Sequence, residues 1–183
     1  MTEFLFLGNL MRQKGVLVLL DACSILRKNN QSFKCHFVGA NSKDLPRTEI
    51  DGKIHELQLH DCVVMHGPMY GADKETVLQQ IHIMVFPSFY HNECFPLVLL
   101  EAMKNKMAII STNEGAIPDM VLQNNNGLLV EKENALALAN AMQVFIDSPY
   151  LAAEMGHAGF EHYQSNFTAD IFINTLRSIL ADA

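Results

Sequence analysis

The sequence predicts an α/β protein of the Rossmann-like, doubly wound class, with a parallel sheet of about six strands, helices on both faces and a helical C-terminus. Over the first 130 residues, short β-rich runs alternate with segments of helical periodicity. This alternation is typical of βαβ units, which build parallel sheets. From residue 135 onward the apolar spacing is helical throughout. Right-handed crossovers then place helices on both faces of the sheet.

The expected strands are short β-rich runs, several of which end at glycine or proline. They cover residues 4–7, 33–38, 62–65, 83–86, 107–110 and 128–130. The expected helices repeat apolar residues every three or four positions and cover residues 15–28, 50–59, 72–81 and 96–106. Ligands of such sheets bind at the carboxyl ends of the strands, so the loops that follow the strands are the candidate sites.

Bulk composition indicates one folded domain that spans residues 1–183. Hydrophobic residues make up 49% of the 183 residues and charged residues 18%, which excludes a disordered tail. Apolar runs fall short of the roughly 18 residues that a membrane span needs. The formal net charge of −7, with no basic stripe, disfavours a nucleic-acid partner. The four cysteines lack metal-type and disulfide-type spacing, so we expect free thiols in the cytoplasm.

The loop after the first expected strand, residues 8–15, carries Arg12 and Lys14 between two glycines. A helix N-terminus attracts phosphate, and Lys14 adds a full charge beside it. A solvated loop that merely aids solubility is an equally good interpretation of this segment alone. The second glycine comes too late for a G-x-G-x-x-G fingerprint, which disfavours a nicotinamide-dependent oxidoreductase, and the loop lacks the Gly-Lys-Ser/Thr of a P-loop.

Two glutamates flank the start of the fourth expected helix. Pro96 suits the first turn of a helix, so Glu93 precedes the helix and Glu101 lies within it. The neighbours of Glu101 are apolar nearly all round, so we expect a buried helix. Its two carboxylate oxygens match the adjacent hydroxyls of a ribose diol. In the alternative interpretation, Glu101 pairs with a lysine or arginine and Glu93 caps the helix.

Glu93 and Glu101 form an E-x7-E motif inside ECFPLVLLEAM, which resembles the donor-site motif of the GT-B-fold, family 4 retaining glycosyltransferases. Further segments resemble other motifs of that family in the same order, namely residues 8–15, 37–39, 66–69, 85–88, 111–119 and 126–130. The resemblance implies that the chain is one half of a GT-B fold: the C-terminal, nucleotide-sugar donor-binding domain, with the N-terminal acceptor domain absent.

The resemblance also assigns roles to individual residues. Lys14 is expected to contact the diphosphate and stabilise the departing charge, and Glu93 to hydrogen-bond hydroxyls of the donor sugar; both are the expected catalytic residues. Glu101 is expected to hold the ribose diol and Met69 to pack on the base. Backbone N–H groups near Glu93 are expected to line the sugar and phosphate. The other expected nucleotide-sugar-binding residues are Gly8, Asn9, Arg12, Cys94, Phe95 and Leu97.

The chain departs from the family pattern at two places. The usual arginine of the phosphate loop falls at Asn9, with Arg12 as its candidate replacement. The usual G-F-G is here Cys94-Phe95-Pro96, and Pro96 has no N–H to donate. The leading function is transfer of a sugar, with retention, from a UDP- or GDP-sugar to a glycan or lipid-linked acceptor. The departures favour the alternative, a non-catalytic nucleotide-sugar-binding or interaction module of the same fold.

Further expectations concern cofactors, the activity of the chain alone, its location and its last helix. No metal or other cofactor is expected, and the glutamate pair should not flank one glycosidic bond as in a glycosidase, because Glu101 lies behind the nucleotide. The chain alone is expected to lack transferase activity, and the whole enzyme to be cytoplasmic, with peripheral membrane association as an option. The last helix has an apolar face, and we expect it to pack on its own sheet, stay exposed or bind another copy. That face consists of Phe172, Leu176, Ile179 and Leu180.

Overall fold

The computed structural model, which describes residues 1–181, contains one six-stranded sheet in the order β3-β2-β1-β4-β5-β6. Every pair of neighbouring strands is parallel. This confirms the predicted fold class. The strands are β1 (Thr2–Leu7), β2 (Phe33–Val38), β3 (Val63–Gly67), β4 (Ile83–Phe86), β5 (Ala108–Thr112) and β6 (Gly127–Val130).

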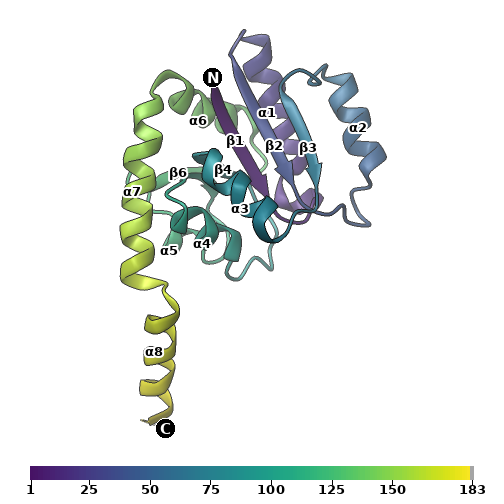
Figure 1. Ribbon diagram of the computed structural model, residues 1–183. Helices are drawn as coiled ribbons and strands as arrows, with labels where there is room; N and C mark the ends of the chain where they lie inside the picture. The colour runs from purple at the N-terminus through teal and green to yellow at the C-terminus, as the bar shows by residue number, and fades with distance from the viewer. Residues whose placement is uncertain (182–183) are drawn as a thin grey trace.

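Helices cover both faces of the sheet (Figure 1). From β1 the chain moves outward to β2 and β3, and from β4 it moves the opposite way to β5 and β6, so right-handed crossovers place the two sets of helices on opposite faces. One face carries α1 (Val16–Lys28), α2 (Arg47–Glu56) and α6 (Ala135–Asp147). The other carries α3 (Gly71–Gln80), α4 (Leu97–Lys104), α5 (Ile117–Met120) and α7 (Pro149–Asn166).

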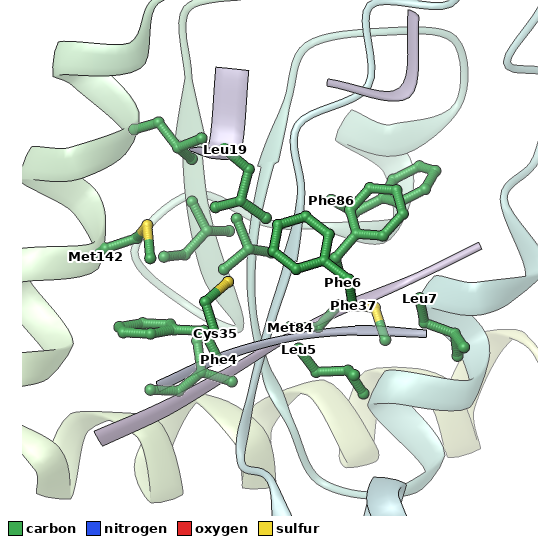
Figure 2. Packing of buried hydrophobic residues seen from close by; sticks show 14 of the residues in the cluster. Phe4, Leu5, Phe6, Leu7, Leu19, Cys35, Phe37, Met84, Phe86 and Met142 are labelled. Atoms are coloured by element: carbon green, nitrogen blue, oxygen red, sulfur yellow. The ribbon is translucent and has the colours of Figure 1, made fainter. Parts of the chain in front are cut away.

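The core is apolar on both sides of the central strand β1 (Figure 2). Successive strand residues point to opposite faces, so Phe4 and Phe6 face one layer of helices while Leu5 faces the other. The ring of Phe6 stacks on Phe37 and Phe86, with centroids 5.7 and 6.1 Å apart. Coverage on both faces explains why β4 and residues 4–7 of β1 are continuous apolar runs, whereas β2, which lies nearer the edge, alternates apolar and polar residues.

One expectation about α4 is wrong. The helix is not buried all round, because 66% of Leu97 is exposed and Val98, Leu100 and Glu101 are half-buried. The apolar composition of α4 suggested more burial than the structure shows, because the helix is only eight residues long and only part of its surface packs on α7. The sequence also gave no sign of the short helix α5, or of the 3-10 helix η1 (Arg12–Lys14).

The C-terminal region is helical, as predicted, but it is divided into three helices. Pro149 begins α7, and the chain turns again at Phe167 before α8 (Ala169–Ala181). Helix α8 extends away from the sheet and its covering helices (Figure 1), and none of its described residues is buried. Among the helices of residues 1–181, none is both long enough and apolar enough to cross a bilayer.

Candidate functional site

The order of the strands reverses between β1 and β4, and this reversal creates a crevice at the carboxyl edge of the sheet. Because the chain leaves these two neighbouring strands toward opposite sides, the loops that follow them diverge, and such crevices bind ligands in open α/β sheets. The loop after β1 carries Lys14, and the loop after β4 carries Glu93. The two residues that the sequence singled out as catalytic therefore meet at the place where this fold binds ligands.

Lys14 and Glu93 form a partly buried ion pair at this crevice. The Nζ atom of Lys14 lies 3.4 Å from Oε2 of Glu93, and 5.3 Å from the centroid of the Phe86 ring. The hydroxyl of Ser88 donates a hydrogen bond of 3.0 Å to the same Oε2. Glu93 is 7% exposed, and a carboxylate so deeply placed needs such partners. The ammonium of Lys14 keeps donors free for a further anion, since it has three.

Three loops are locked together around this ion pair. The backbone N–H of Phe89 donates to the carbonyl of Gln13 at 2.8 Å, which joins the loops after β4 and β1. The hydroxyl of Thr112, at the end of β5, donates to the carbonyl of Ser88. At Gly115, φ is +52° and an added Cβ would lie 1.6 Å from the carbonyl oxygen of Glu93. Glycine is therefore required for the loop after β5 to support the loop of Glu93.

A depression of about 190 Å³ lies beside the crevice, bounded by the ends of β1 and β2 and by α3 and α4. Its floor depends on Gly39, where an added Cβ would lie 1.8 Å from the carbonyl oxygen of Gly8. Four residues that the sequence analysis assigned to the nucleotide line it together: Gly8, Asn9, Met69 and Glu101. Tyr70, of which 77% is exposed, stands at its rim.

The alternative interpretation, in which Glu101 pairs with a lysine or arginine and Glu93 caps the helix, is confirmed for Glu101 and wrong for Glu93. Glu101 does have a cationic partner, since Nζ of Lys74 lies 2.7 Å from its Oε1. Its side chain is 37% exposed and faces the depression. Glu93 does not cap α4, because the N-cap is Pro96 and no side chain among residues 1–181 caps that helix.

The backbone N–H groups that follow Glu93 remain free. Within the described part of the chain, those of Cys94, Phe95 and Leu97 donate no hydrogen bond. Free N–H groups at the first turn of a helix attract anions. The side chains of Phe95 and Leu97 do not line the depression; they line a groove of about 670 Å³ between α4 and the junction of α7 and α8, which Glu101 also borders. There the ring centroid of Phe95 lies 5.9 Å from that of Phe167.

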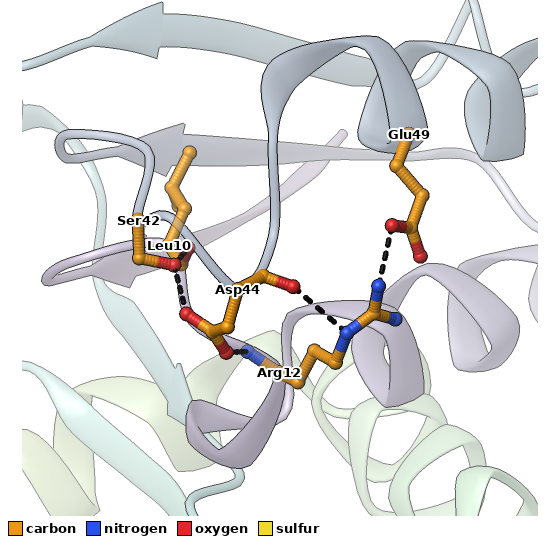
Figure 3. A network of polar contacts seen from close by, with 5 residues as sticks. All are labelled: Leu10, Arg12, Ser42, Asp44 and Glu49. Atoms are coloured by element: carbon orange, nitrogen blue, oxygen red, sulfur yellow. Dashed lines mark hydrogen bonds and ion pairs between the residues drawn. The ribbon is translucent and has the colours of Figure 1, made fainter.

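Arg12 does not join Lys14 (Figure 3). Its guanidinium forms an ion pair with Glu49 of α2, and its Nε donates to the carbonyl oxygen of Asp44 at 2.9 Å. The Ser42 hydroxyl and the Arg12 backbone N–H hold the pKa of the Asp44 carboxyl below its usual range. Arg12 thus ties the loop after β1 to the loop before α2, and it does not line the depression.

Sequence reasoning missed the functional neighbours Ser88, Lys74 and Gly115. Ser88 and Gly115 stood inside quoted motifs, yet nothing in the sequence showed that they touch the Glu93 segment. Lys74 lies in a polar helix outside the quoted motifs, so the sequence allowed a lysine or arginine partner for Glu101 but did not indicate which one. Among residues 1–181, no three His, Cys, Asp or Glu side chains gather as metal ligands would.

The structure has all four cysteines as free thiols. Cys23, Cys35 and Cys62 are buried and Cys94 is exposed. Burial raises the pKa of the Cys62 thiol to about 12.

Comparison with known proteins shows the family of the chain. The family described as glycosyl transferases group 1 matches residues 2–162. The chain is 28% identical over 166 residues to a D-inositol 3-phosphate glycosyltransferase of Arthrobacter sp. (strain FB24), an alignment that covers 88% of this chain and 38% of the relative. The chain therefore spans well under two thirds of that relative's length.

Two solved structures share the fold. A sucrose-phosphate synthase from Thermosynechococcus elongatus is 27% identical, with a TM-score of 0.86 over 100% of this chain and 46% of that one. The Anabaena protein HepE, solved in complex with UDP-glucose, is 19% identical, with a TM-score of 0.86 over 99% of this chain and 49% of that one. The family match covers most of the sequence, and it confirms the predicted kind of family: the chain belongs to the group 1 glycosyltransferases.

Proposed function

We propose that residues 1–183 form the donor-binding domain of a glycosyltransferase that moves a sugar, with retention, from a nucleoside diphosphate sugar to a glycan or lipid-linked acceptor. The observation that carries the proposal is the Lys14–Glu93 pair, 3.4 Å apart at the strand-order reversal, beside the depression that contains Glu101. At this edge of the sheet, Lys14 matches the diphosphate of such a donor and the buried carboxylate of Glu93 matches its sugar. The carboxylate of Glu101 matches its ribose diol.

In this proposal Lys14 binds the diphosphate and stabilises the negative charge that develops as the sugar leaves. Fixed cations and free N–H groups at a developing charge are an effective form of catalysis, because they need no reorganisation during the reaction. The free N–H groups of Cys94, Phe95 and Leu97 add donors on the same side. Glu93, held by Ser88, accepts hydrogen bonds from sugar hydroxyls. We assign no covalent nucleophile.

The depression takes the nucleoside. Glu101 accepts from the ribose diol, while Met69 and the exposed ring of Tyr70 lie where a flat base would pack. The complex of HepE with UDP-glucose supports a UDP-sugar as donor, and a GDP-sugar is the alternative. Neither a metal nor another cofactor enters this proposal, because protein cations and N–H groups supply the charge.

The acceptor half is supplied by a separate domain. Relatives and neighbours are about twice as long as the matched region, which supports a second domain that binds the acceptor. On this proposal the whole enzyme is cytoplasmic, with peripheral contact to membranes where lipid-linked acceptors reside, and the chain alone does not transfer sugar.

A non-catalytic nucleotide-sugar-binding module remains the second candidate, on the strength of two residues. Asn9 lines the depression where the family pattern places an arginine, and Pro96 supplies no N–H at the start of α4. This candidate predicts donor binding without transfer when the acceptor domain is present.

Calorimetric titration of the chain with UDP, GDP, ADP and their sugars tests the donor site. We expect one nucleotide to bind, and Glu101→Ala and Lys14→Ala each to weaken it by roughly tenfold or more, because each removes a charged hydrogen-bond partner. Lys53→Ala, in the distant pair with Asp21 of α1, is the control and should leave the affinity unchanged. If none of the nucleotides bound, the donor-site proposal would be wrong.

A further inference from the structure

The ion pair between Lys74 and Glu101 connects two helices across the mouth of the depression. Lys74 belongs to α3 and Glu101 to α4, and Nζ lies 2.7 Å from Oε1. Both side chains line the depression together with the ends of β1 and β2. The contact therefore sets where the carboxylate of Glu101 stands relative to anything that enters.

The chain contains another lysine–carboxylate pair of the same length and similar exposure that does not line the depression. Lys53 and Asp21 are also 2.7 Å apart, with 27% and 41% of their side chains exposed, against 27% and 37% for Lys74 and Glu101. Exposed pairs of this kind add little stability, typically below about 1 kcal/mol. Stability thus gives no reason to single out Lys74, and its position beside the depression is what distinguishes it.

The pairing leaves Glu101 prepared to accept two further donors. A carboxylate offers about four lone-pair sites. Lys74 takes one on Oε1, which leaves acceptor sites on both carboxylate oxygens of Glu101, a residue that lines the depression. A vicinal diol presents two hydroxyl donors at a fixed spacing, and a carboxylate held in one orientation binds them without a further ordering cost. A ligand that covers Glu101 also removes water from its negative charge. The positive charge of the Lys74 ammonium then offsets the cost of this desolvation.

We propose that Lys74 is a positioning residue that holds Glu101 for a vicinal diol, so that the depression distinguishes ribose from 2′-deoxyribose nucleotides. The inference deepens the proposed donor site and rests on it. Lys74 acts through Glu101 and needs no contact with the nucleotide.

The test compares the Kd of a ribonucleoside diphosphate with that of its 2′-deoxy counterpart, using UDP and 2′-deoxy-UDP or, if guanine is preferred, GDP and 2′-deoxy-GDP. The unaltered chain should prefer the ribose form by roughly tenfold or more, because a hydrogen bond to a charged group is lost in the deoxy form. Lys74→Met should reduce this preference to below roughly threefold, mainly by weakening the ribose form. Lys74→Arg, which keeps a cation, should restore most of it.

Lys53→Met is the matched control, since it breaks an ion pair of equal length and exposure away from the depression. It should leave both affinities and their ratio unchanged. An unaltered ratio in Lys74→Met would overturn the inference, and so would tighter ribonucleotide binding, which would show that Lys74 competes with the ribose for Glu101. Absence of nucleotide binding in the unaltered chain would instead refute the donor site itself, so the two failures are distinct.

Discussion

Ser88 determines the local surroundings of Glu93. It is fully buried, donates to the carboxylate at 3.0 Å and receives the hydroxyl of Thr112 at its own carbonyl. The remaining partner of Glu93 on the same oxygen is Lys14, at the longer distance of 3.4 Å. The serine hydroxyl is thus the closer of the two groups that orient the buried carboxylate toward the crevice.

We predict that Ser88→Ala destabilises the fold by about 1–3 kcal/mol, because a buried carboxylate loses a donor. If Glu93 contacts the sugar, the variant should bind a nucleotide sugar several-fold more weakly while binding the free nucleotide normally. Denaturant unfolding and calorimetry measure the two effects. Ser111→Ala removes a buried hydroxyl that donates to the carbonyl of Phe86 at 2.6 Å instead, so it should cost stability without this difference. Equal weakening of both ligands would contradict the assignment of Glu93 to the sugar.

At the scale of elements, the site is built by loops that follow β1, β4 and β5 and meet at close range. Gly115 is the tightest of these contacts, since its added Cβ would lie 1.6 Å from the carbonyl oxygen of Glu93. The loop after β5 thereby fixes the main chain of the residue expected to touch the sugar. Both β4, which precedes Glu93, and β5, which precedes Gly115, must therefore be in place before Glu93 is correctly positioned.

Gly115→Ala is expected to destabilise the fold by about 1–3 kcal/mol, from the left-handed backbone and the steric contact together. It should also weaken nucleotide-sugar binding, because the loop of Glu93 must shift. Thermal unfolding and the Kd of the sugar nucleotide report both. Gly52→Ala in α2 is the control: nothing lies within 4 Å of its added Cβ, so it should stabilise the helix by about 0.5–1 kcal/mol. If Gly115→Ala were as stable as the unaltered chain, the loop after β5 would be able to move away from Glu93 without cost, which would contradict this prediction.

At the scale of the whole molecule, α8 stands apart from the packed domain. Phe172, Ile179 and Leu180 are each more than 60% exposed, and no described residue of α8 is buried. Of the alternatives for this helix, packing on its own sheet is therefore wrong, and its apolar face is exposed. Buried apolar area provides most of the stability of a domain, so α8 contributes little of it.

Removal of residues 169–183 should change the free energy of unfolding by less than about 0.5 kcal/mol, because none of the described residues of α8 is buried. Chemical denaturation of the truncated and complete chains measures this. Phe145→Ala, within the fully buried core of α6, is the contrasting variant and should cost about 3–5 kcal/mol. A loss of more than about 1 kcal/mol on truncation would show that α8 packs on the domain in solution.

Local patterns in the sequence were enough to predict the strands and the fold class. Apolar runs, their glycine and proline ends and the helical spacing between them depend on neighbouring residues alone, so β2 and β4 have the predicted bounds. Resemblance to a family supplied Lys14, Glu93 and Glu101, and the structure places the first two in contact and the third in the adjoining depression. Burial was harder to predict, as Leu97 shows, because exposure depends on which helices lie across from α4.

The order of the strands and main helices, the family and the residue types of the site follow from periodicity and motif spacing, so they could be predicted from the chain alone. Which side chains act together became clear from the three-dimensional arrangement. The reversal of strand order brings Lys14 to Glu93, α3 brings Lys74 to Glu101, and Arg12 turns instead to Glu49. Each of these pairs joins residues far apart in the chain, and their distance depends on crossovers and helix packing that no local pattern encodes.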